Sequence, residues 1–95
     1  MSVKIKSWKA SDYINSPEEY LKASLEAVQE TGDSRIFNKA LQDVAKAQKI
    51  SVIAEKSGLG RESLYKALTP DSHPRFDTIN KVVNAMGFKL TIEAV

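Results

Sequence analysis

Apolar residues recur every three or four positions in several stretches of the chain, and this spacing is typical of amphipathic helices. The first stretch follows Ser16, an expected helix cap, with Pro17 at the first helical position and Glu19 completing a capping box. The pattern predicts a helix from Pro17 to about Thr31, ended by Gly32. Its inner face would be formed by Tyr20, Leu21, Ser24, Leu25 and Val28.

A longer apolar stripe predicts a second helix from Ser34 to about Gln48, capped by Asp33. Lys46 and Lys49 lie near its C-terminus, where cations complement the helix dipole. Its apolar positions are Ile36, Phe37, Ala40, Leu41, Val44 and Ala45. This helix is expected to be the central pillar of the core.

Residues 50–68 predict two short helices joined by a tight glycine turn. Ser51 would cap the first helix, and Gly58 would end it in the left-handed conformation that glycine adopts at low cost. Leu59 would fill the gap between the helices, and Gly60 would open the second helix. This order is typical of a helix-turn-helix.

The second of these helices is expected to run from about Arg61 to Leu68, with Leu64, Ala67 and Leu68 facing inward. Ala54 is small where the two helices would cross, so their axes can approach closely. The alternative interpretation is an ordinary helical hairpin in which the glycine serves only as a C-cap.

Two prolines in residues 69–76 exclude a continuous helix there and predict a loop. Asp77 would cap a last helix from Thr78 to Met86, ended by Gly87. Its inward positions would be Ile79, Val82, Val83 and Met86.

Apolar and polar residues alternate strictly in residues 88–93, which predicts a short C-terminal β-strand. Residues 2–7 alternate in the same way and give a possible N-terminal strand. Because a lone strand leaves its backbone groups unmatched, its partner would be residues 2–7, a second copy or another protein. The expected fold is all-α, a bundle of about five helices with this short strand.

The composition excludes several classes of protein. The absence of cysteine excludes disulfides and thiolate metal sites, and the lone His73 has no second ligand nearby, so neither a metal nor a cofactor is expected. No glycine-rich phosphate loop or evident pair of acids supports an enzyme. No apolar run approaches the ~20 residues of a membrane span and no secretory signal is evident, so a cytoplasmic protein is expected.

The charge is uneven along the chain. Residues 1–34 carry four lysines and six acidic residues, whereas residues 35–95 carry ten basic and six acidic residues. This distribution is typical of a polyanion-binding module, here residues 33–95, joined to an N-terminal arm and helix, residues 1–32, with another task.

Several motifs together resemble the addiction-module antidote proteins, which are HigA-type antitoxins with a lambda-repressor-like helix-turn-helix domain. These motifs are S-W-K-A-S-D-Y-I-N-S-P-E-E-Y, D-V-A-K-A-Q-K-I-S, G-L-G-R-E-S-L-Y-K-A-L and P-R-F-D-T-I-N-K-V-V-N-A-M-G. The chain departs from the family at Gly60, where serine is more common. The resemblance implies a homodimer that binds operator DNA, represses its own operon and neutralises a RelE/ParE-like toxin.

A helix-turn-helix lays its second helix in the major groove, so the outward residues of that helix are candidate DNA contacts. They are Arg61, Glu62, Ser63, Tyr65 and Lys66. Arg61 is the best base reader, because its guanidinium can donate twice to guanine, and Lys66 suits a phosphate. Flanking phosphate contacts are expected from Ser51, Thr69, Ser72 and Arg75, whereas His73 suits an ordinary loop residue at least as well.

Dimerisation is expected through the last helix and the strand, with Phe88, Leu90 and Ile92 at the interface. Toxin binding is expected within residues 1–31, with aromatic anchors at Trp8, Tyr13 and Tyr20. The alternative for Tyr20 is packing against the neighbouring helix.

Two other functions fit the same pattern. A phage-type repressor would bind DNA without a toxin partner, and only the neighbouring gene distinguishes it from an antitoxin. A protein–protein adaptor would have an acidic or apolar second helix, whereas Arg61 and Lys66 are basic.

Overall fold

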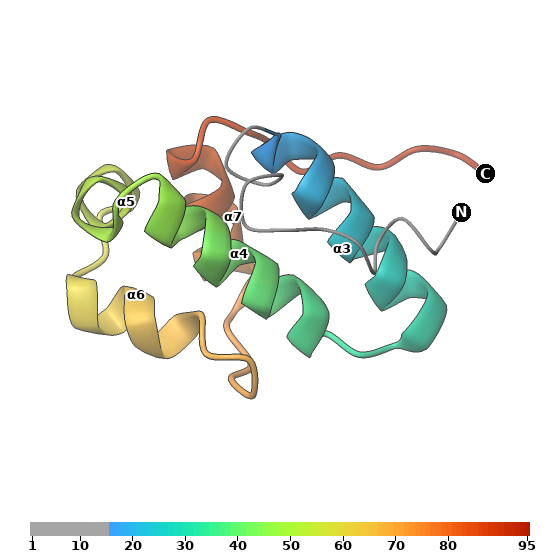
Figure 1. Cartoon of the computed structure of the whole chain (residues 1–95), viewed down its shortest axis with the longest axis horizontal. Helices are drawn as coiled ribbons and strands as arrows, with labels where there is room; N and C mark the ends of the chain where they lie inside the picture. Colours follow the sequence, from blue (N-terminus) through green and yellow to red (C-terminus); the bar gives the residue numbers. More distant parts are fainter. Residues whose placement is uncertain (1–15) are drawn as a thin grey trace.

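The computed structural model describes residues 16–95, and every structural statement below refers to this part of the chain. These residues form five α-helices and no β-strand (Figure 1). The helices are α3 Pro17–Thr31, α4 Arg35–Ala47, α5 Ile50–Ser57, α6 Arg61–Ala67 and α7 Phe76–Ala85. The predicted all-α fold is therefore confirmed, and the helix bounds differ from the prediction by only a few residues.

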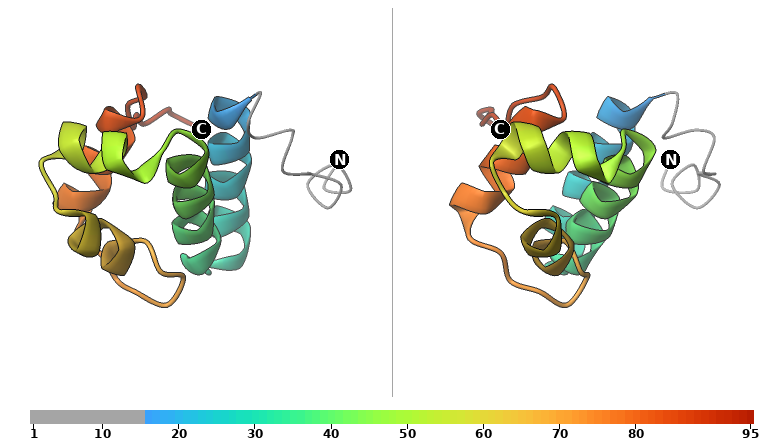
Figure 2. Two further views of the ribbon diagram at one scale, coloured as in Figure 1. Left: turned by 60° about the vertical axis from the view of Figure 1, so that its left-hand side comes forward. Right: turned by 90° about the vertical axis from the view of Figure 1, so that its left-hand side faces the viewer.

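The helices are arranged around α4. Figure 2 shows α3 beside α4 on one flank, with α5, α6 and α7 on the other flank. The α3–α4 turn contains Gly32 at φ 76°, whose amide donates to the carbonyl of Val28 at 2.6 Å. Helix α4 lies between α3 and α6. The unit formed by α5 and α6 is therefore not covered by α3 on its outer side.

The apolar face of α4 forms the centre of the core, as its periodicity predicts. Leu41, Val44 and Ala45 are completely buried, and α3 contributes Leu21 to the same cluster. The remaining core residues are Phe37, Ala40, Ile50, Ile53, Ala54, Leu64, Leu68, Val82, Val83 and Met86. Burial of one large aliphatic side chain stabilises a fold by about 1.5–3 kcal/mol, so this cluster is the main source of stability.

The caps of α3 and α5 differ from the prediction. Ser16 occupies the N-cap of α3 but makes no side-chain capping hydrogen bond, so the expected capping box is absent. Ser51 lies inside α5 rather than at its cap, because the burial of Ile50 brings that residue into the helix. The cap is instead Lys49, which has φ 79° and is the only non-glycine residue with positive φ in residues 16–95.

The start of α7 also differs from the prediction. Arg75 is the N-cap in an extended conformation, and Asp77 lies within the first turn. There its carboxylate complements the helix dipole and pairs with Lys81 at 3.5 Å. Asp33, the predicted cap of α4, partly fulfils that role. Its Oδ1 accepts the amide of Arg35 at 3.0 Å, although the N-cap residue is Ser34.

The predicted C-terminal strand is not formed. Residues 88–95 are irregular, and their backbone hydrogen bonds within the described part are limited to the Phe88 amide, which donates to the Val83 carbonyl at 3.1 Å. Phe88 and Leu90 still pack on the core while Lys89 and Thr91 are exposed, which accounts for the alternating sequence. A strand requires a neighbouring strand, and residues 16–95 offer none. The possible N-terminal strand, residues 2–7, lies outside the described residues.

The turn between α5 and α6 yields a test of its backbone requirement. Gly58 has φ 79° and Gly60 has φ −71°, and a Cβ added at either position would meet open space. We expect Gly58→Ser to lower the free energy of unfolding by about 1–2 kcal/mol, because a side chain is strained in the left-handed region. Chemical denaturation followed by circular dichroism measures this change.

The same substitution two residues later is the control. Gly60→Ser should leave stability unchanged or raise it by a few tenths of a kcal/mol, since serine is a good N-cap and the backbone there is extended. Equal effects of the two substitutions would contradict a specific requirement for glycine at position 58.

Candidate nucleic-acid interface

Helices α5 and α6 form a compact unit around the predicted glycine turn. Figure 1 looks along α5 and shows α6 from the side, and the right view of Figure 2 reverses this, so the helices cross at a large angle. Ala54 is buried, which suits the expected close crossing, and Leu59 packs partly against the core. The geometry thus matches the order of elements that the sequence predicts.

A buried hydroxyl that the sequence analysis missed braces this turn. Ser57, the last residue of α5, donates its hydroxyl to the carbonyl of Ala54 at 3.2 Å. The same oxygen accepts the amide of Leu59 at 3.3 Å. The serine-glycine pair at the end of a short helix could have indicated this role, because serine often bonds to nearby backbone at helix ends.

Two leucines fix α6 to the core. Leu64 and Leu68 are 0% and 1% exposed, whereas Ala67 is half-buried. The outer face consists of the predicted residues Arg61, Glu62, Ser63, Tyr65 and Lys66, all of them exposed. The structure therefore brings these five candidates together on one side of one helix.

The cations of this face have no internal partner. Among residues 16–95, neither Arg61 nor Lys66 forms an ion pair or a side-chain hydrogen bond, although Glu62 is next to Arg61 in the chain. Four of the eleven lysines and arginines of the described part pair with carboxylates, and Arg61 and Lys66 are among the seven that do not. Arg61 and Lys66 are thus available to an external anion.

The predicted flanking contacts fall into two groups. Ser51 and Arg75 are exposed, Ser51 in the first turn of α5 and Arg75 at the N-cap of α7. The hydroxyl of Thr69 instead donates to the carbonyl of Lys66 at 3.1 Å, and that of Ser72 donates to the carbonyls of Ala67 and Thr69 at 2.6 and 2.9 Å. These two hydroxyls would have to give up internal bonds before donating to a phosphate. The lone His73 is exposed in the same loop.

A buried amide holds the loop that follows α6. The side chain of Asn38, on α4, is 4% exposed, and its Nδ2 donates to the carbonyls of Thr69, Pro70 and Ser72 at 3.5, 3.2 and 2.9 Å. The periodicity of the sequence does not predict this role. In the sequence, Asn38 stands out only as a polar residue next to Phe37 and three residues before Leu41, on a helix face that is otherwise apolar.

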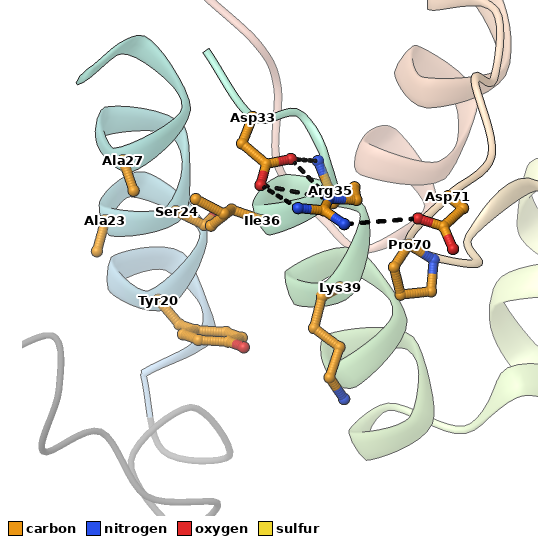
Figure 3. A pocket seen from close by; sticks show the side chains of 10 residues that line it. All are labelled: Tyr20, Ala23, Ser24, Ala27, Asp33, Arg35, Ile36, Lys39, Pro70 and Asp71. Carbon is orange, nitrogen blue, oxygen red and sulfur yellow. Dashed lines mark hydrogen bonds and ion pairs between the residues drawn. The ribbon is translucent and has the colours of Figure 1, made fainter. Parts of the chain in front are cut away.

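A charged cluster at the start of α4 lies close to the same loop (Figure 3). The guanidinium of Arg35 bonds to both carboxylate oxygens of Asp33 and lies 3.9 Å from the carboxylate of Asp71. The hydrogen bonds from Arg35 hold the pKa of Asp33 below its ordinary value, and the same contacts raise the pKa of Arg35. Because Arg35 and Asp71 are largely exposed and Asp33 is partly exposed, these contacts contribute little stabilising energy.

The surface between α3 and α4 is hollowed. A depression of about 640 Å³ is lined by Tyr20 and by the small or aliphatic side chains of Ala23, Ala27 and Ile36, with Arg35 and Asp71 at its rim (Figure 3). Tyr20 is half-buried, and its hydroxyl donates to Asp43 at 2.8 Å. Tyr20 therefore does pack on α4, which was the alternative to its role as a toxin anchor.

The other predicted interface residues are dispersed. Trp8 and Tyr13 lie outside the described residues. Phe88 and Leu90 pack partly against the core, whereas Ile92 is 96% exposed. Within residues 16–95, no set of three or more acidic or histidine side chains is placed to hold a metal ion, and no helix is long and apolar enough to span a bilayer.

Comparison with known proteins adds the following findings. Residues 4–94 match the sequence profile of a family described as "Probable addiction module antidote protein". An uncharacterized protein of Haemophilus influenzae is 33% identical over 93 residues, which cover 98% of this chain and 95% of that protein. No solved structure matches the chain.

Proposed function

The chain belongs to the family of probable addiction module antidote proteins, and from this premise we propose that it is the antitoxin of a type II toxin–antitoxin module. The family description implies a cognate toxin as partner and a binding role rather than an enzymatic one. In our proposal the chain also represses its own operon, by binding duplex DNA through a lambda-repressor-like helix-turn-helix formed by α5 and α6.

One observation carries the proposal of DNA binding. The outer face of α6 presents Arg61 and Lys66 without internal partners, on a helix whose position is fixed by two buried leucines. A short helix that is held rigidly and carries unpaired cations suits insertion into the major groove. This combination argues against the adaptor, for which the outer face would need to be acidic or apolar.

The residues of this face take different roles in the proposal. Arg61, near the N-terminus of α6, would donate to guanine O6 and N7. Glu62, Ser63 and Tyr65 would contact neighbouring bases or sugars. The phosphate contacts would come from Lys66, Ser51, Thr69, Ser72 and Arg75, with Thr69 and Ser72 contributing less because their hydroxyls bond internally.

Two single substitutions on α6 test this assignment. Arg61→Ala should reduce the preference for the protein's own upstream DNA over scrambled DNA by about 1–3 kcal/mol, because a bidentate contact to guanine is lost. Lys66→Ala should weaken binding to both DNAs alike and lower the salt slope of log K by about 1. Fluorescence anisotropy at several salt concentrations measures both effects.

A matched control lies on the far side of the molecule. Lys22→Ala on α3 also removes one exposed lysine and should leave both quantities unchanged. If the wild-type protein binds its upstream DNA without salt dependence, or if Arg61→Ala preserves the full preference, the proposed DNA-binding role fails.

We propose further that the protein acts as a homodimer joined by its C-terminal segment. Within the described part, the backbone from Lys89 to Val95 forms no backbone–backbone hydrogen bond, and Ile92 is exposed. The same segment of a second copy would satisfy these groups by forming a short antiparallel ladder. A dimer also doubles the DNA contacts and reads half-sites about one turn apart.

This dimer can be tested by light scattering. The wild-type protein at micromolar concentration should have twice the mass of the chain, and Leu90→Pro should shift it toward the monomer, because proline cannot donate to a ladder. Ile92→Ala is a milder variant that keeps the backbone donor. A wild-type protein that is monomeric both free and on DNA would contradict the dimer.

Toxin binding is proposed for the N-terminal region, residues 1–32, with residues 33–95 as the DNA-binding module. The hollow beside Tyr20 on the α3–α4 surface is a candidate part of this site, and it is shared between the two regions, because Ile36 and Pro70 line it as well as Ala23 and Ala27. Trp8 and Tyr13 would be the main aromatic anchors against a RelE/ParE-like toxin, and Tyr20, which packs on α4, would offer only the part of its ring that remains exposed.

Deleting residues 1–14 should reduce capture of the cognate toxin at least tenfold while DNA binding is retained, since the helices of the DNA-binding module remain intact. A pull-down with the purified toxin, together with a gel shift, measures both properties. Undiminished toxin capture would exclude Trp8 and Tyr13 as anchors. The absence of any cognate toxin would favour the phage-type repressor.

A further inference from the structure

Asn38 differs from the other buried polar side chains of residues 16–95. Ser24 and Ser57 are also buried, but each donates to a carbonyl of its own helix, three residues earlier. The amide of Asn38 instead reaches from α4 to a separate segment, 31 to 34 residues later in the chain. A buried amide that joins two elements at such separation fixes their relative position.

The segment that Asn38 holds has no regular structure of its own. Between α6 and α7 the chain turns through residues 68–75. Within it the amide and the hydroxyl of Ser72 donate to the carbonyl of Thr69, and the hydroxyls of Thr69 and Ser72 also donate to carbonyls at the end of α6. The amide of Asn38, whose two N–H groups are shared among three carbonyls, ties this loop to α4. Without Asn38 the carbonyls of Pro70 and Ser72 would lose their bonds to α4, whereas the carbonyl of Thr69 would keep its bonds from Ser72, and the loop would gain conformational freedom.

The direction of these bonds also affects the electrostatics of the surface. Carbonyl oxygens carry partial negative charge and repel a phosphate. Three of them, from Thr69, Pro70 and Ser72, are turned toward the buried amide of Asn38. The loop ends at Arg75, whose exposed side chain has no ion-pair partner among the described residues.

We propose that Asn38 is a positioning residue for binding to the DNA backbone. It does not reach DNA; it holds the loop so that Arg75 and α6 present cations at a fixed separation. Affinity for any duplex then depends on Asn38, whereas the choice of sequence does not. This inference rests on the proposed function of α6.

The test compares Asn38→Ala with the wild-type full-length protein on the protein's own upstream DNA and on a scrambled duplex. We expect weaker binding to both duplexes by the same factor. One lost phosphate contact should lower the salt slope by about 1, so the fall in affinity between 50 and 200 mM salt should be smaller by roughly threefold. The ratio of the two affinities should stay within twofold of wild type.

A double-mutant cycle identifies the group through which Asn38 acts. If Asn38 positions Arg75, the slope of the Asn38→Ala/Arg75→Ala protein should equal that of Arg75→Ala alone. Leu21→Ala is the matched control for lost stability, because it truncates a core residue of α3 far from the loop and should leave the slope unchanged. Each variant is measured at a temperature where circular dichroism shows it folded.

Hydrogen exchange provides a readout that needs no DNA. Asn38→Ala should accelerate exchange of the Ser72 amide at least tenfold more than Leu21→Ala does. Unchanged exchange, an unchanged salt slope, or a changed ratio between the two duplexes would each overturn the role of Asn38. A wild-type protein without salt-dependent DNA binding would instead refute the proposed function, and hydrogen exchange would then separately decide whether Asn38 orders the loop.

Discussion

Burial of two leucines on α6 is the constraint on which the candidate site depends. A helix of seven residues is unstable alone in water, because nucleation costs more than so few hydrogen bonds return. Leu64 and Leu68 supply the missing stability by entering the core that α4 organises. The same burial sets which side chains face outward, so the chemistry of the outer face is a consequence of packing.

The backbone turn before α6 works together with this packing. Gly58 changes the chain direction at low cost, and the hydroxyl of Ser57 bonds across the turn. On the other side of α6, Asn38 holds the loop. The helix is thus restrained at its start, along its inner face and after its end, each time by a different kind of interaction.

Periodicity predicted the helices well because each has an apolar face that meets the core. Periodicity failed where the structure depends on contacts with residues distant in the sequence. Residue propensity favours Ser51 as the cap of α5, but burial of Ile50 extends the helix and leaves Lys49 as its N-cap. The alternation in residues 88–93 reports that Phe88 and Leu90 pack inward, and it cannot supply the neighbouring strand that a ladder requires.

The outer residues of α6 could be identified from the sequence because a helix has only one face left once its leucines are buried. Asn38 and Ser57 stand out in the sequence only as polar residues at buried positions, and their partners are backbone groups, which every residue carries, so the sequence does not show what they bond to. Thr69 and Ser72 show the opposite case. Their residue types suit a phosphate contact, but their hydroxyls already donate to backbone carbonyls.

The left-handed lysine between α4 and α5 has a consequence for comparison among homologues. A β-carbon at φ 79° costs roughly 1–2 kcal/mol, which the surrounding core offsets. The angle at which α5 leaves α4 is therefore maintained against a local preference. A relative with glycine or asparagine in place of Lys49 would keep the same bend with less strain and would unfold at a higher temperature.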